Sequence, residues 1–153
     1  MHPLDFAMQL ELDGREFYLK QAELIEDEHL RQVFHELAAD EEKHYQLLTQ
    51  IKESGLYDYT ASDILERVPS VFPQPEQGKL RAEEHSSYVT IYEQAIAFEE
   101  KAINLYSELA STAQSDLERD TFLMLEREEE THRSTLWKIL QWLTRPEEWY
   151  PYI

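Results

Sequence analysis

Two sets of ligand-type residues recur in this chain at one fixed offset of 88 positions. In each set, a glutamate is followed thirty residues later by a Glu-x-x-His pair. The sets are Glu11, Glu41 and His44, and then Glu99, Glu129 and His132. Carboxylate and imidazole groups both bind metals, and residues three apart on a helix share a face. The repeat therefore predicts a site for two metal ions, built from two similar halves of one chain.

The duplication extends beyond these six positions. Other residues match at the same offset without a gap. They include Ala7/Ala95, Tyr18/Tyr106, Ala22/Ala110, Phe34/Phe122, Leu37/Leu125, Leu48/Leu136 and Ile51/Ile139. Their spacing within each half is that of amphipathic helices. Each half is therefore predicted to be a helical hairpin, and the two hairpins are expected to bury their apolar faces in an all-α four-helix bundle.

The chain is predicted to form a single domain over residues 1–153, with a long connection between its hairpins. The first hairpin is expected over about 4–53, the crossover over about 55–84, the second hairpin over about 85–143 and a tail over 144–153. Asp27 and Ser115 are expected to cap helices, and Ser62 could cap a short helix over 63–67 within the crossover. A helix of about 25 residues spans about 37 Å, so only a long segment can carry the chain back along the bundle.

Composition excludes several classes of site. Cysteine is absent, which rules out disulfides and thiolate-ligated metal centres within these 153 residues. The net charge of −18 and the lack of a basic patch argue against a nucleic-acid partner. Neither a signal peptide nor a membrane-spanning apolar stretch is recognisable. The expectation is a soluble, cytoplasmic protein with no membrane partner.

The placement of the glutamates supports metal binding. All four repeated glutamates are predicted on faces otherwise occupied by core residues. Burying an unpaired carboxylate costs several kcal/mol, and four in one layer would also repel one another. Two divalent cations would balance the four negative charges. Mixed carboxylate and imidazole ligands suit iron or manganese, and zinc can share them.

Four segments carry a resemblance to a known family. They are "LELDGREFY" around Glu11, "LAADEEKHYQLL" around Glu41, "AFEEKAINLY" around Glu99 and "LEREEETHRSTL" around Glu129. Together they resemble the rubrerythrin-like branch of the ferritin-like superfamily. The resemblance implies a ferritin-like bundle with one long crossover. It also implies that Glu41 and Glu129 bridge the two metals, that Glu11 and Glu99 are terminal ligands, and that His44 and His132 each bind one metal.

The same resemblance implies a reaction. Members of the rubrerythrin-like branch reduce hydrogen peroxide or dioxygen at a di-iron centre, and many form dimers. Rubrerythrins proper also carry a cysteine-ligated rubredoxin domain, which is not found here, so an external electron-donor protein is expected. They place an additional glutamate on the third helix, whereas the residues one turn from Glu99 are apolar here, Ala102 among them.

Several alternatives remain open from the sequence. A ferroxidase or iron-handling protein without peroxide turnover would use the same ligands, and a non-catalytic metal-binding bundle would share the fold. The expected homodimer could also be domain-swapped, with hairpins exchanged between chains.

Few other residues are candidates for the site. Tyr18 and Tyr106 either hydrogen-bond the ligand carboxylates, act as redox relays, or simply pack half-buried in the bundle. Glu126 could substitute for the additional glutamate, although a solvated side chain is the simpler interpretation. No catalytic group beyond the metal ligands is predicted.

Overall fold

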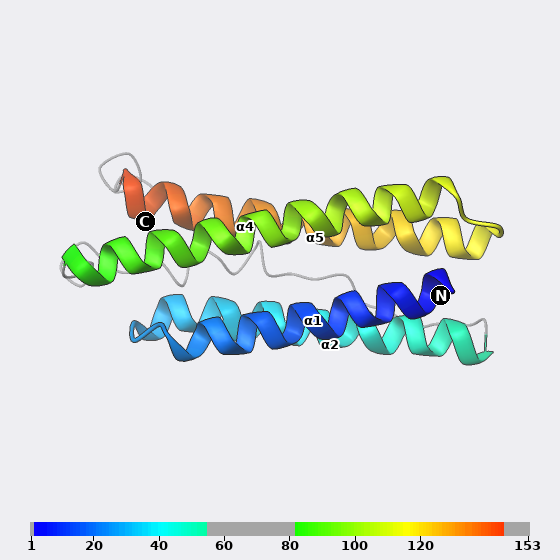
Figure 1. Cartoon of the computed structure of the whole chain (residues 1–153), viewed down its shortest axis with the longest axis horizontal. Helices are drawn as coiled ribbons and strands as arrows, with labels where there is room; N and C mark the ends of the chain where they lie inside the picture. Colours follow the sequence, from blue (N-terminus) through cyan, green and yellow to red (C-terminus); the bar gives the residue numbers. More distant parts are fainter. Residues whose placement is uncertain (1, 55–81, 146–153) are drawn as a thin grey trace.

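The computed structural model describes residues 2–54 and 82–145. In these two ranges the chain forms four helices and no strand: α1 (Pro3–Glu23), α2 (Glu28–Ser54), α4 (Ala82–Ser111) and α5 (Asp116–Thr144). Figure 1 shows two antiparallel hairpins, α1 with α2 and α4 with α5, lying side by side. The predicted all-α four-helix bundle is confirmed.

Side chains just before the helices satisfy free backbone N–H groups at the helix starts. The imidazole of His2 accepts a hydrogen bond from the Leu4 N–H at 3.1 Å, and Pro3 occupies the first helical position of α1. The predicted caps are also present. Asp27 Oδ1 accepts from the Leu30 N–H at 2.9 Å, and Ser115 Oγ accepts from the Glu118 N–H at 3.1 Å.

The two hairpins are joined across the length of the bundle. The helix α2 ends and α4 begins at opposite ends of the molecule (Figure 1), as a single long crossover requires. The helix α4 starts at Ala82, three residues before its predicted start at His85. The predicted short helix over 63–67 and most of the predicted tail lie outside the described residues. The proposed domain limits stay a prediction.

Two apolar clusters fill the bundle, one on each side of a polar layer. The cluster nearer the α1–α2 turn is centred on Tyr18, Phe34, Leu37, Tyr92 and Leu136. The cluster nearer the α4–α5 turn is centred on Leu4, Leu48, Tyr106, Phe122 and Leu125. The layer between them contains buried glutamate and histidine side chains. Burying unpaired charges inside an apolar bundle costs free energy, and bound cations would lower that cost.

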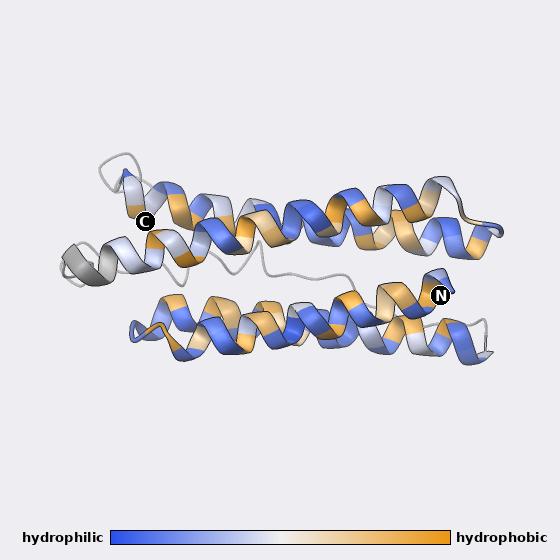
Figure 2. Ribbon diagram, in the orientation of Figure 1, coloured by the Kyte–Doolittle hydropathy of each residue, from blue (hydrophilic) through white to orange (hydrophobic). Residues whose placement is uncertain are grey.

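Hydropathy varies along each helix in the way expected for amphipathic elements. Apolar and hydrophilic positions alternate along all four helices in Figure 2. Across residues 2–54 and 82–145, no helix has a segment of the length and apolarity that crossing a membrane demands.

Two tyrosines of α4 fix the second hairpin to the turn of the first. The buried hydroxyl of Tyr88 accepts hydrogen bonds from the N–H groups of Glu26 and Asp27, at 2.9 and 3.1 Å. The hydroxyl of Tyr92 donates to the carbonyl oxygen of Leu30 at 3.0 Å. These bonds help to set the position of α4 against α1 and α2. They therefore help to bring the polar residues of the two hairpins to the same level along the bundle axis.

Candidate metal centre

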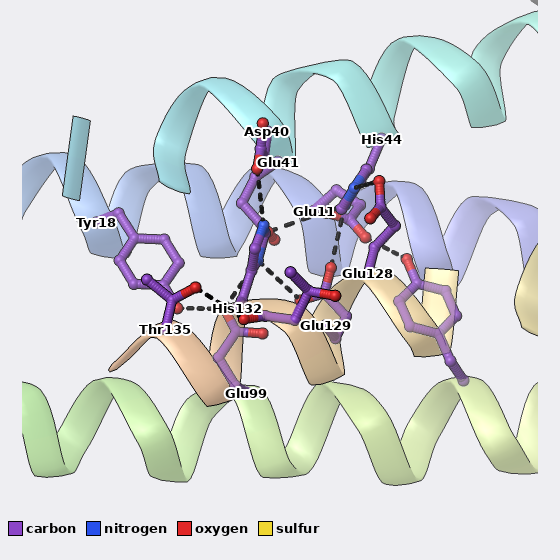
Figure 3. A network of polar contacts seen from close by, with 12 residues as sticks. Glu11, Tyr18, Asp40, Glu41, His44, Glu99, Glu128, Glu129, His132 and Thr135 are labelled. Atoms are coloured by element: carbon purple, nitrogen blue, oxygen red, sulfur yellow. Dashed lines mark hydrogen bonds and ion pairs between the residues drawn. The ribbon is translucent and has the colours of Figure 1, made fainter. Parts of the chain in front are cut away.

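All six residues of the repeated motif meet in the polar layer. Glu11 extends from α1, Glu41 and His44 from α2, Glu99 from α4, and Glu129 and His132 from α5 (Figure 3). Their exposed fractions are 0–1%. Each occupies a position that the helical period assigns to the core, which is why residues from four helices converge at one level.

The ligand atoms fall into two overlapping groups, within each of which they lie no more than 4.8 Å apart. The first group, here called the His44 position, contains Glu11, Glu41, His44 and Glu129. The second group, the His132 position, contains Glu41, Glu99, Glu129 and His132. Both groups share Glu41 and Glu129. This arrangement suits two ions held side by side with two carboxylates between them.

Both histidines turn the same ring nitrogen toward the carboxylates. His44 Nδ1 lies 3.1 Å from a Glu129 oxygen and 3.2 Å from a Glu11 oxygen. His132 Nδ1 lies 3.1 Å from a Glu41 oxygen and 3.3 Å from a Glu99 oxygen. Nδ1 is therefore the nitrogen placed to bind a metal at each position.

Several buried atoms of the cluster fit metal ligands better than hydrogen-bonding groups. Glu41 Oε1, Glu99 Oε2, both carboxylate oxygens of Glu129 and His132 Nδ1 have no hydrogen bond within the described ranges. All of them except Glu99 Oε2 lie at ion-pair distances from their neighbours but without hydrogen-bond geometry. Buried polar atoms are normally satisfied. A pair of cations would satisfy these atoms together, so the donor set fits a dinuclear metal centre.

The electrostatics of the cluster also show a need for positive charge. Burial and then the neighbouring carboxylates raise the pKa of Glu41 and of Glu129 well above the ordinary value. Burial alone would lower the pKa of His44 and His132, but the facing carboxylates raise both well above the ordinary value. Burial alone would raise the pKa of Glu99, but His132 and the other partners of Glu99 lower that pKa overall. The shared glutamates and both histidines therefore hold protons more tightly than isolated side chains do.

Tyr18 and Tyr106 contact the ligand carboxylates across the hairpins. Both are fully buried. The Tyr18 hydroxyl donates a hydrogen bond to Glu99, and the Tyr106 hydroxyl donates to Glu11. Burial and the nearby carboxylates raise the pKa of both hydroxyls, which keeps them protonated as donors. The hydrogen bonds expected from the sequence are observed, with the side chains fully rather than half buried, and the role of redox relay stays a prediction.

Sequence reasoning missed Asp40 and Glu128, which immediately precede the two shared glutamates. Asp40 Oδ2 lies 3.0 Å from His132 Nε2, and Glu128 Oε1 lies 3.8 Å from His44 Nε2. One signal was available, because both halves carry an acidic residue at this repeated position. The position is about 100° from the ligand glutamate around the helix, however, and so is the following acidic pair, Glu42 and Glu130. The helical period alone cannot tell the two pairs apart.

Gly14 was also missed, and it makes room for a shared carboxylate. A methyl group at this buried position would lie 2.7 Å from Glu41 Oε2 and 3.1 Å from the ring of Phe98. We expect Gly14→Ala to leave the metal-free fold intact, since alanine gains about 1 kcal/mol of helix propensity over glycine. It should displace the Glu41 carboxylate and weaken Mn²⁺ binding by about tenfold or more. Isothermal titration with Mn²⁺ measures this loss.

Ala102 occupies the position of Gly14 in the second half of the chain and supplies the control. Ala102→Gly should cost about 1 kcal/mol of stability through helix propensity without crowding any carboxylate. Its Mn²⁺ affinity should therefore match the unmodified protein. Equal affinities for Gly14→Ala and Ala102→Gly would contradict the steric role of Gly14.

Comparison with known families identifies the family of the chain. The family profile named Rubrerythrin matches residues 3–94 and, separately, residues 90–151. The chain belongs to the rubrerythrin family. Each matched segment contains one of the two repeated ligand sets, so the rubrerythrin match follows the internal duplication. No curated protein and no solved structure matches the chain significantly. The 153 residues contain no cysteine that could form the rubredoxin centre of rubrerythrins proper.

Proposed function

We propose that this protein is a di-iron oxidoreductase that reduces hydrogen peroxide or dioxygen as Fe²⁺ is oxidised. The observation that supports this most directly is the pair of ligand groups that share Glu41 and Glu129. Two ions with common carboxylates can act on one substrate molecule together. Iron suits the mixed carboxylate and imidazole donors, and manganese or zinc are the alternatives.

Two ferrous ions at this site would supply two electrons, which with two protons convert hydrogen peroxide to two waters or dioxygen to hydrogen peroxide. Glu11 and His44 would hold one ion, Glu99 and His132 would hold the other, and both ions would share Glu41 and Glu129. Burial of the layer excludes bulk water from the reacting atoms. The hydroxyls of Tyr18 and Tyr106 hold the terminal carboxylates in place.

The electrons for further turnovers are proposed to come from a separate electron-donor protein. No thiolate-ligated donor centre can form in a chain without cysteine. A homodimer, domain-swapped or not, and a cytoplasmic location are part of the same proposal. Size-exclusion chromatography with light scattering would test the dimer directly.

Anaerobic mixing of the Fe²⁺-loaded protein with hydrogen peroxide tests the reaction. We expect two Fe²⁺ to be oxidised for each peroxide, faster than the same concentration of free Fe²⁺. Glu129→Ala should bind fewer than two irons per chain and lose the acceleration. Glu130→Ala, which removes an exposed carboxylate one residue away, is the matched control and should react like the unmodified protein. Oxidation no faster than that of free Fe²⁺ would remove the enzymatic proposal.

A ferroxidase or iron-handling role without peroxide turnover is the second candidate. It is favoured by the apolar residues one turn from Glu99, such as the buried Ala102, because rubrerythrins proper are expected to carry an additional glutamate on this helix. Repeated additions of peroxide with an excess of a chemical reductant separate the two. A peroxidase consumes peroxide in every cycle, whereas a ferroxidase oxidises its iron once and then responds only to newly added Fe²⁺.

A further inference from the structure

Each histidine of the centre is held between carboxylates of both hairpins. His132 on α5 faces the ligand glutamates with Nδ1 and faces Asp40 on α2 with Nε2, at 3.0 Å. His44 on α2 faces the ligands with Nδ1 and faces Glu128 on α5 with Nε2, at 3.8 Å. Asp40 and Glu128 are themselves buried, with exposed fractions of 3% and 6%. Each hairpin therefore supplies the carboxylate behind the histidine of the other (Figure 3).

Asp40 and Glu128 are placed to accept a hydrogen bond from a metal-binding histidine. A neutral histidine that binds a metal through Nδ1 carries its proton on Nε2. In a buried layer that N–H needs an acceptor. A carboxylate behind the ring supplies the acceptor, fixes the tautomer and the ring orientation, and makes the ligating nitrogen more basic.

The two carboxylates do not reach their histidines equally. The Asp40–His132 distance of 3.0 Å is that of a good hydrogen bond, whereas the Glu128–His44 distance of 3.8 Å is that of a longer ion-pair contact. Glutamate also has one more rotatable bond than aspartate, so holding it in one conformation costs more entropy. The duplicated halves thus differ at the residue behind each histidine, although the six ligand types are the same.

We propose that Asp40 and Glu128 are positioning residues for the histidine of the opposite hairpin, and that Asp40 makes the His132 position the tighter of the two metal positions. The inference rests on the metal centre of the proposed function, but not on its redox chemistry. The first metal then binds at Glu41, Glu99, Glu129 and His132, and the second completes the His44 position.

Titration of the metal-free full chain with Co²⁺, followed by its visible absorption, tests the inference. The unmodified protein should bind two Co²⁺ with different affinities. Asp40→Ala should weaken the tighter event by about 10- to 100-fold, whereas Glu128→Ala should weaken only the other. Asp40→Asn keeps an acceptor oxygen at the same distance and should recover part of the affinity. Glu130→Ala, an exposed neighbour that loses the same charge, should leave both events unchanged.

A spectroscopic measurement identifies the position that is filled first. With one Co²⁺ per chain, the unmodified protein should give one strongly shifted N–H proton resonance from the ligating histidine, slow to exchange with solvent. Asp40→Ala should lose or broaden that resonance, while its metal-free melting temperature shows whether the variant is folded. If it does not fold, Asp40→Asn, whose amide is a weaker acceptor than the carboxylate, should still broaden the resonance relative to the unmodified protein.

The outcomes separate this inference from the proposed function. Two Co²⁺ bound with equal affinity, or an Asp40→Ala titration identical to that of Glu130→Ala, would overturn the inference and leave the dinuclear centre standing. Failure of the unmodified protein to bind Co²⁺ at all would overturn both.

Discussion

Saturating Mn²⁺ is expected to raise the melting temperature of the metal-free protein by about 20 °C. A ligand at 1,000 times its Kd stabilises the folded state by about 4 kcal/mol per site, and each kcal/mol shifts the melting temperature of a domain of this size by roughly 2–4 °C. Two sites therefore account for the expected rise. Mn²⁺ is the suitable probe because it takes carboxylate ligands and does not oxidise in air as Fe²⁺ does. Differential scanning calorimetry with and without Mn²⁺ measures the shift.

A double variant, Glu41→Gln with Glu129→Gln, is the control for this experiment. The amides keep the size of the side chains and remove the two charges shared by both metal positions. The metal-free variant should be at least as stable as the unmodified protein, since the repulsion among buried carboxylates is relieved. Mn²⁺ should then raise its melting temperature by only a few degrees. An equal rise in both proteins would place the bound Mn²⁺ elsewhere, for instance among the surface carboxylates.

The fold and the composition of the site followed from the sequence because one pattern specified both. The period of the apolar residues assigns Phe34, Leu37 and Leu48 to one face of a helix, and Glu41 falls on that same face. Because the second half of the chain repeats this pattern, the same periodicity predicts the second hairpin. Four carboxylates on core faces have few explanations other than bound cations. The level at which the six residues meet could thus be predicted from their register alone.

Other features depend on how the hairpins pack, which the helical period does not fix. Asp40 is buried because α5 brings His132 against it, whereas the neighbouring Glu42 pairs with Arg15 at the surface. Tyr18 bonds Glu99 of the other hairpin rather than a residue of its own. The space beside Gly14 exists only because Glu41 and Phe98 approach it from two other helices. All three are contacts between segments that are distant in the sequence.

The two halves of the candidate metal centre are similar but not identical. The ligands repeat without change, but Asp40 is replaced by Glu128 and Gly14 by Ala102 in the second half. These substitutions surround the ligands rather than replace them. A duplicated site can therefore keep its metals while the two positions differ in affinity, which allows one ion to stay bound while the other exchanges or reacts.

The stability of the metal-free protein is expected to fall as the pH rises from about 5 to about 8. The pKa of His44 and of His132 is raised above 6.5, so their contribution is complete below that pH and is lost as the pH passes the folded value. The pKa of Glu41 and of Glu129 is raised above 4.5, so the folded state also holds protons that the unfolded state has released. Only Glu99 in this cluster has a lowered pKa, which opposes the trend.

Urea denaturation of the metal-free protein at a series of pH values measures this dependence. General repulsion at a net charge of −18 has the same sign, so the Glu41→Gln, Glu129→Gln variant must be compared at each pH. It retains the surface charge but loses two of the shifted carboxylates, and its stability should depend less on pH. Mn²⁺ should reverse the trend, because binding releases the protons held by the ligands and therefore strengthens with pH. Parallel profiles for the two metal-free proteins would mean that Glu41 and Glu129 hold no excess protons, and that the histidines and the surface charge set the pH dependence.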